Sequence, residues 1–262
     1  MTALKSVLIT GASSGIGAVY AERFAARGHN LVLVARDKAR LDTLAAQLRD
    51  AHGVSVDVLP ADLTELRDIE AVEARLREDA TIGILVNNAG AAQSGGFIQQ
   101  STESVARLVA LNTTALVRLA SAIAPRLVAA GEGSIINIGS VVGLAPELNM
   151  TVYGATKAFV QFLSQGLTLE LGPKGVYVQA VLPAATRTEI WDRAGIDINQ
   201  LPEIMEVGDM VDAALLGLDR RENVTIPPLQ DAAYWDTLQG ARQAFLGNLK
   251  QSTVAPRYRN EA

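Results

Sequence analysis

Tyr153 and Lys157 stand four residues apart in "VYGATKAFVQFLSQGLTLELG", a segment whose apolar spacing predicts a helix. Residues i and i+4 share one face of a helix, so the phenol and the ammonium face the same site. An ammonium about 5 Å from a phenolate, at an effective dielectric of about 20, stabilises it by roughly 3 kcal/mol. We expect this to lower the phenol pKa by about two units, which suits a general acid and base.

A second group of residues could bind phosphate. Gly11, Gly15 and Gly17 lie in "TGASSGIG", between an apolar run and a helical pattern. Glycines let a backbone approach a pyrophosphate closely, and the N-terminus of the following helix offers free N–H groups. The order G-x-x-x-G-x-G differs from the common G-x-G-x-x-G, but its place between strand and helix predicts a dinucleotide site.

Two other classes of site share parts of this motif. Residues 11–15 also fit G-x-S-x-G, the nucleophile elbow of α/β-hydrolases. A hydrolase triad needs a histidine late in the chain, and His29 and His52 both fall in its first quarter. A P-loop would need Gly-Lys-Ser/Thr after the glycines, which is absent. The dinucleotide interpretation is therefore favoured.

Strands and helices alternate along the chain. Apolar runs rich in Val and Ile, from "SVLIT" to "GVYVQAVL" and the weaker "NVTIP", are separated by segments of helical period. Continuous apolar runs are typical of strands covered on both faces, and the alternation predicts βαβ units. We expect one α/β domain over 1–262 with a doubly wound parallel sheet, a substrate lid near 188–205 and a helical appendage over 228–262.

Composition excludes several classes of protein. The formal charge is −5 and cysteine is absent, which argues against nucleic-acid binding, disulfides and thiolate metal sites. No run of apolar residues approaches the roughly 18 of a membrane span. The start, "MTALKSVLIT", resembles a first strand more than a signal peptide. We expect a cytoplasmic protein with a small-molecule substrate and neither metal, nucleic-acid nor membrane partners.

Six motifs in order resemble those of the short-chain dehydrogenase/reductase family, over roughly residues 4–227. They are "TGASSGIG", Asp62 in "ADLT", "NNAG" at 87–90, Asn112 in "LNTT", Ser140 in "NIGS", and "YGATK". The resemblance implies a Rossmann-like sheet of about seven strands, bound NAD or NADP, and hydride transfer between a carbonyl and an alcohol. It also implies a homodimer or homotetramer formed through the two longest helices.

The same resemblance implies roles for individual residues. Tyr153 would be the general acid and base, Lys157 would tune it and hold the nicotinamide ribose, and Ser140 would polarise the substrate oxygen. Asn112, inside one long predicted helix, would hold a water in a proton relay to Lys157. Cofactor contacts fall on a larger set: Gly11, Ser13, Ser14, Gly15, Ile16, Gly17, Arg36, Asp62, Leu63, Asn88, Ala89, Gly90, Tyr153, Lys157, Pro183, Thr186 and Thr188.

The choice of coenzyme depends on the end of the second strand, "LVLVARD". NAD-preferring relatives carry an acid there, whereas this chain has Ala35 followed by Arg36, which can pair with a 2′-phosphate. Asp37, 20 residues after Gly17, could serve as a ribose ligand, but its position also suits the N-cap of the next helix. We predict NADP(H) and keep NAD as the alternative.

The substrate side of the chain is apolar. Loops after the strands offer a set of uncharged side chains: Val142, Leu148, Met150, Ile190 and Trp191. They predict an apolar or aromatic ketone or secondary alcohol as substrate. Ala184 stands where the family has glycine, which raises a question about the backbone there. Two alternatives remain: a 3-oxoacyl-acyl-carrier-protein reductase, and a catalytically lapsed NADP-binding sensor or scaffold.

Overall fold

The computed structural model describes residues 4–93, 95–201 and 203–259. By contacts the chain divides into two compact units, residues 1–227 and residues 228–262, each described by itself. Residue 202 of the predicted lid and residues 260–262 of the predicted appendage lie outside the described residues. The assignment of the whole chain to one domain stays a prediction.

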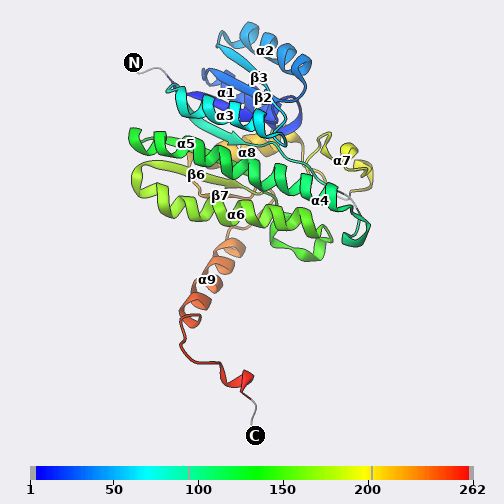
Figure 1. Cartoon of the computed structure of the whole chain (residues 1–262), viewed down its shortest axis with the longest axis vertical. Coiled ribbons are helices and arrows are strands. Elements are labelled where there is room, and N and C mark those ends of the chain that lie inside the picture. The colour runs from blue at the N-terminus through cyan, green and yellow to red at the C-terminus, as the bar shows by residue number, and fades with distance from the viewer. Residues whose placement is uncertain (1–3, 94, 202, 260–262) are drawn as a thin grey trace. The chain divides into compact units, whose positions relative to one another are not determined.

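The larger unit is built on one parallel sheet of seven strands in the order β3-β2-β1-β4-β5-β6-β7 (Figure 1). The predicted doubly wound, Rossmann-like fold is confirmed. The chain leaves β1 in one direction and restarts at β4 in the other, which makes the gap between β1 and β4 the switch point of the sheet. The strands are β1 Ser6–Thr10, β2 Leu31–Ala35, β3 Val56–Pro60, β4 Ile82–Asn87, β5 Gly133–Ile138, β6 Val176–Val181 and β7 Val224–Thr225.

Helices cover both faces of this sheet, which is why its inner strands are apolar along their whole length. One core packs α1, α2 and α8 on the first face, and the other packs α3, α5 and the end of α6 on the second face. In Figure 1, α3 and α5 cross the viewer's side of the sheet. The helices of this unit are α1 Gly15–Ala26, α2 Lys38–His52, α3 Leu66–Glu78, α4 Thr102–Val109, α5 Leu116–Ala130, α6 Thr151–Leu171, α7 Ile190–Arg193 and α8 Val207–Asp219.

The single helix expected around Asn112 is interrupted. A π-helical turn, Ala110–Ala115, joins α4 to α5. The continuous helical stretch Thr102–Ala130 has 29 residues and is apolar enough to cross a membrane by length and composition, which the count of apolar runs overlooked. Its most apolar window is 44% buried inside the protein, and a single helix of this kind is weak evidence for a membrane span.

Buried amides cross the second core. Asn87 donates to Asn137 Oδ1 over 3.0 Å, and Asn137 donates to Ser164 Oγ over the same distance. The chain of bonds links β4, β5 and α6 through their side chains. Because buried polar groups are costly unless paired, these bonds fix the register of α6 against the sheet. Both asparagines stand in quoted motifs, "NNAG" and "NIGS", but the sequence did not predict that they bond each other.

The smaller unit contains α9, Ala233–Asn248, and a short 3-10 turn, Pro256–Tyr258. No residue of α9 is buried, and the exposed apolar side chains of this unit include Tyr234, Phe245 and Leu249. The helix itself was expected from the sequence.

Tyr20 on α1 provides a test of the first core. Its side chain is fully buried, and among the described residues its hydroxyl has no hydrogen-bond partner. A buried unpaired hydroxyl costs about 1–3 kcal/mol, so Tyr20→Phe should raise the free energy of unfolding by about 1 kcal/mol in urea denaturation. Tyr177→Phe is the control, because the Tyr177 hydroxyl donates to Glu222 O over 2.5 Å and its loss should destabilise. Equal destabilisation by both variants would contradict the assignment.

Candidate active site

The predicted phosphate-binding residues form a tight turn between β1 and α1. Gly11 has φ +66°, and a Cβ on Gly17 would lie 2.4 Å from Gly11 O. Only glycine fits both places. Ser14 is the N-cap of α1 but makes no side-chain bond to the backbone of that helix. The first-turn N–H groups of a helix have no partners within the helix, so those of α1 are available to an anion.

Asn88 holds this turn from behind. Its Nδ2 donates to Thr10 O over 2.9 Å and to Gly11 O over 3.2 Å. Thr10 Oγ1 in turn accepts from the backbone N–H groups of Asn88 and Ala89, both over 3.0 Å. The predicted cofactor residue Asn88 therefore supports the glycine turn with its side chain. Thr10 was missed, although a threonine ending an apolar strand before a glycine motif was a usable signal.

The end of β2 presents Arg36 to solvent. Its Nη1 lies 3.8 Å from Asp62 Oδ2, so the two predicted coenzyme residues face each other. Burial alone would raise the pKa of Asp62, but hydrogen bonds from Thr64 and the nearby Arg36 hold it below its ordinary value. Asp37 accepts from Arg40 N over 3.0 Å and caps α2, as expected of a helix cap. Leu63 lies buried in the second core.

Tyr153 and Lys157 meet on the buried face of α6. Lys157 Nζ donates to Ile138 O at the end of β5 over 2.8 Å and lies 5.6 Å from the centroid of the Tyr153 ring. Their exposed fractions are 6% for Lys157 and 9% for Tyr153. The i, i+4 spacing thus places the ammonium beside the phenol, as expected.

The expectation that Lys157 lowers the pKa of Tyr153 was wrong for the protein chain without coenzyme. Burial raises its pKa to about 12, and a hydrogen bond with Ser140 opposes the rise only in part. Burial also lowers the pKa of Lys157 to about 8. Both shifts have one cause, because removal from water disfavours the charged form of each group. Spacing along a helix predicts the attraction between the two groups but says nothing about how deeply both are buried.

Ser140 links the end of β5 to Tyr153. Its hydroxyl donates to Pro183 O over 3.3 Å, accepts from Val142 N over 3.2 Å, and shares a hydrogen bond with the Tyr153 side chain. The serine therefore caps the 3-10 turn Val141–Leu144 and also stands beside the phenol. Ser140 can therefore cap this turn and still contact Tyr153.

Asn112 explains the π-helical turn. Its Oδ1 accepts from Ala91 N over 2.9 Å, and its Nδ2 donates to Ala91 O over 3.0 Å and to Thr156 Oγ1 over 3.1 Å. A Cβ on Gly90 would lie 3.3 Å from Asn112 Oδ1 and 3.7 Å from Lys157 Nζ, which places Gly90 beside both. The amide fastens the β4 loop to the helix, and an inserted π-turn lets it reach.

The loop after β6 carries the last of the predicted coenzyme contacts. Thr186 is buried, and its hydroxyl donates to Ala184 O over 3.1 Å. A Cβ on Gly15 would lie 3.0 Å from the Thr188 methyl, so Thr188 lies over the glycine turn. Among described non-glycine residues only Asn149 and Arg221 have positive φ. Ala184 therefore adopts backbone angles that any residue accepts, and the missing glycine causes no strain there.

The predicted substrate residues divide into two groups. Val142 and Met150 pack against the small cluster of Leu108, Val152 and Tyr153, beside the phenol. Leu148 is 51% exposed, and Ile190 and Trp191 lie on α7, where Trp191 Nε1 donates to Thr186 O over 2.8 Å. The structure thus brings Val142 and Met150 to Tyr153, and the binding roles of all five stay predictions.

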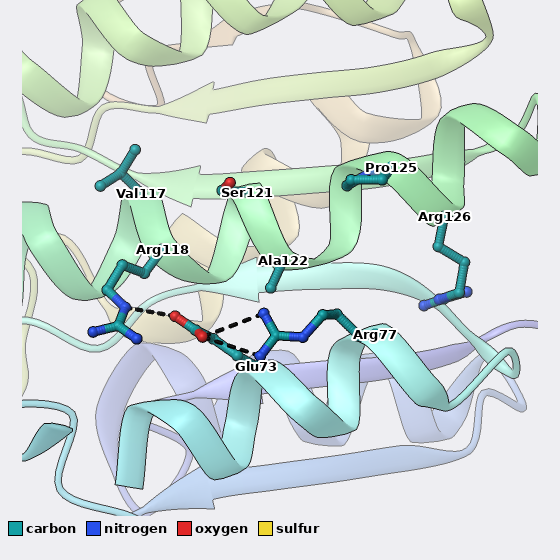
Figure 2. Close-up of a pocket in the computed structure, with 8 residues that line it drawn as sticks. All are labelled: Glu73, Arg77, Val117, Arg118, Ser121, Ala122, Pro125 and Arg126. Atoms are coloured by element: carbon teal, nitrogen blue, oxygen red, sulfur yellow. Dashed lines mark hydrogen bonds and ion pairs between the residues drawn. The ribbon is translucent and has the colours of Figure 1, made fainter. Parts of the chain in front are cut away.

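A cavity between α3 and α5 lies apart from these residues (Figure 2). At its floor, Glu73 pairs with Arg118 over 2.5 Å and with Arg77 over 3.2 Å. These bonds, led by the one from Arg118, keep the pKa of Glu73 below its ordinary value. None of the residues that line the cavity is among the predicted site residues, and we interpret the cluster as an ion-pair network that joins the two helices.

The chain is similar in sequence and fold to known proteins. Residues 5–198 match the family model described as short chain dehydrogenase. A short-chain dehydrogenase from Sphingobium yanoikuyae, solved in complex with NADPH, is 70% identical, with a TM-score of 0.97 over 98% of this chain and 100% of that one. A bulky-bulky ketone specific alcohol dehydrogenase from Comamonas testosteroni is 62% identical, with a TM-score of 0.92 over 98% of this chain and 99% of that one.

A curated relative is more distant. The very-long-chain 3-oxoacyl-CoA reductase of Anas platyrhynchos is 35% identical over 188 residues, which are 70% of this chain. The chain covers 60% of that reductase, so it spans less than two thirds of the relative's own length.

Arg36→Ala tests the nucleotide side of the site. If the guanidinium pairs with a 2′-phosphate, its loss should raise the Kd for NADPH roughly tenfold to hundredfold and leave the Kd for NADH within about twofold. Titration of nicotinamide fluorescence measures both constants. Arg27→Ala is the control, because Arg27 is an exposed arginine that pairs with Asp219. An equal loss for both coenzymes would contradict the phosphate assignment.

Proposed function

The chain belongs to the short-chain dehydrogenase family, and on that premise we propose that it is an NADP(H)-dependent oxidoreductase interconverting a carbonyl compound and a secondary alcohol. The observation that carries the proposal is the convergence of Ser140, Tyr153 and Lys157 at the end of β5 and the start of α6. All three are buried, so a substrate oxygen that reaches them would leave bulk water.

The residues present fit the coenzyme. The glycine turn and the N-terminus of α1 suit a pyrophosphate, and Arg36 at the end of β2 suits a 2′-phosphate. The NADPH complex of the Sphingobium yanoikuyae relative agrees with this preference. When bound, NADPH supplies the hydride, and the protein supplies position and protons.

Three side chains share the proton chemistry. The Ser140 hydroxyl, which stands beside Tyr153 and donates to Pro183 O here, would turn to donate to the carbonyl oxygen of the substrate. The Tyr153 hydroxyl, protonated across the neutral range because burial raises its pKa to about 12, donates its proton as negative charge develops on that oxygen. The Lys157 ammonium, held by Ile138 O, stabilises the charge left on the phenol oxygen. Alcohol oxidation runs this transfer in reverse: the phenolate form of Tyr153, which a pKa of about 12 makes a small fraction at neutral pH, takes the hydroxyl proton of the alcohol.

The substrate we favour is a ketone with apolar groups. Val142 and Met150 pack against the cluster that contains Tyr153, and their uncharged side chains support an apolar substrate. The Comamonas testosteroni relative, described as specific for bulky-bulky ketones, supports a substrate of that kind. An acyl-carrier-protein substrate would need free basic groups near the site, but Arg187 and Arg193 after β6 pair with Glu206 and Glu189. The presence of Asn112, Ser140, Tyr153 and Lys157 together favours an enzyme over a catalytically lapsed sensor.

Tyr153→Phe tests the proton donor. The variant keeps the ring but removes the hydroxyl, so kcat for ketone reduction should fall by about 10²- to 10⁴-fold. Binding of NADPH should stay within about twofold, because the coenzyme sees little change in shape. Absorbance at 340 nm, over a panel of bulky aromatic and small ketones, measures turnover. Tyr177→Phe, which removes a buried hydroxyl elsewhere, should retain activity. Comparable turnover by Tyr153→Phe would reject the assigned donor.

The pH dependence of reduction tests Lys157. Because burial lowers its pKa to about 8, its ammonium is charged below that pH and neutral above it. The rate of reduction should therefore hold level at low pH and fall as pH rises through about 8. Tyr153 does not account for such a step, since its pKa is about 12.

Lys157→Arg keeps the charge at high pH, so the fall in its pH–rate profile should move upward. Lys157→Met should be slow, with no step near pH 8. A wild-type profile that stays level to pH 10 would contradict the role of the ammonium.

A further inference from the structure

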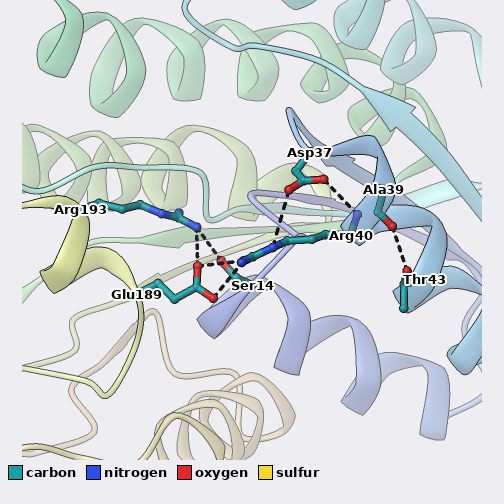
Figure 3. Close-up of polar contacts among 7 residues, drawn as sticks. All are labelled: Ser14, Asp37, Ala39, Arg40, Thr43, Glu189 and Arg193. Carbon is teal, nitrogen blue, oxygen red and sulfur yellow. Dashed lines mark hydrogen bonds and ion pairs between the residues drawn. The ribbon is translucent and has the colours of Figure 1, made fainter.

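The loop after β6 carries a carboxylate that bonds across the nucleotide side of the site (Figure 3). Glu189, just before α7, accepts from Arg40 Nη1 through both oxygens, over 2.9 Å and 2.8 Å. Arg193 Nη2 donates to Glu189 Oε2 over 2.6 Å. The pKa of Glu189 is held below its ordinary value, chiefly by the bond from Arg40, so the carboxylate is ionised at neutral pH.

The two arginines connect α7 to different helices. Arg40 comes from the first turn of α2, where its Nε also lies 3.6 Å from Asp37 Oδ2. Arg193 Nη2 reaches back to Ser14 Oγ, the N-cap of α1, over 3.4 Å. Thr188 lies over Gly15 between them. The segment after β6 is thus joined to the N-termini of both α1 and α2.

These N-termini are where the proposed function places the coenzyme, with the pyrophosphate at α1 and the adenosine ribose beside the end of β2. A dinucleotide bound along both N-termini would lie beside the segment that contacts Ser14, Arg40 and Gly15. We propose that Ser14, Arg40, Glu189 and Arg193 form a clasp that holds α7 over the bound coenzyme and slows its release. The inference rests on the proposed function, because it needs a dinucleotide in this cleft.

Exposure of the clasp determines which measurement would detect it. The side chains of Arg40, Glu189 and Arg193 are 49%, 43% and 56% exposed, and exposed ion pairs add little to global stability. The free energy of these ion pairs, although small, would shift the equilibrium between a closed and an open position of α7. A variant that loses the clasp should therefore unfold like the wild type but release coenzyme faster.

The experiment is stopped-flow dissociation of NADPH, followed by its fluorescence, with the full-length protein. Glu189→Gln should release NADPH about fivefold faster, as expected for a loss of about 1 kcal/mol, with an unchanged Tm. Arg40→Gln should show a similar increase. In 1 M salt the difference between wild type and Glu189→Gln should shrink, because salt screens exposed charges.

Glu206→Gln is the matched control. It removes the Arg187–Glu206 pair, 2.7 Å long, from the same part of the chain without touching α1 or α2. Its dissociation rate should equal that of the wild type. Release from Glu189→Gln at the wild-type rate, or equal acceleration by Glu206→Gln, would overturn the clasp. A wild-type protein that binds no NADPH would overturn the proposed function as well, whereas an active Tyr153→Phe would overturn only the assigned proton donor.

Discussion

The ammonium of Lys157, held by the carbonyl of Ile138 at the end of β5, is the contact on which the site depends. Burial of an ammonium is costly, so the charge is tolerated only where a backbone oxygen accepts from it. That bond ties the start of α6 to the sheet. It therefore places Tyr153, one turn earlier, beside Ser140 at the end of the same strand. If the Lys157 side chain pointed elsewhere, no ammonium would lie beside the Tyr153 phenol.

The helix packed beside this contact is irregular, and buried polar side chains bond across it. A π-turn interrupts the long helix at Asn112, and the amide of this residue makes two hydrogen bonds with the backbone of Ala91. Thr156 joins Asn112 to the backbone of Tyr153. Departures of this kind collect at functional sites, where the rest of the fold stabilises them. Here the stabilising part is the parallel sheet with two apolar cores.

Much of the fold and site was predictable because its signals are local. The strand–helix alternation, the glycine turn, the Asp37 cap and the Tyr153–Lys157 spacing each span few residues, and each has a counterpart in the structure. The helical segment over 102–130 was predicted, but its π-turn at Ala110–Ala115 was missed, since the Asn112 side chain there bonds Ala91, 21 residues away. The Asn87–Asn137–Ser164 chain and the clasp were missed because their partners are distant in sequence.

The sequence by itself determined which chemical groups are available and which of them share a helix face or a turn, because backbone geometry fixes those relations over a few residues. Tertiary structure alone decided the protonation behaviour of Tyr153 and Lys157, since their pKa values follow from burial by segments far along the chain. It also decided that Glu189 meets Arg40, 149 residues away. Burial and long-range contacts arise only when the chain packs, so the spacing of residues along the sequence does not predict them.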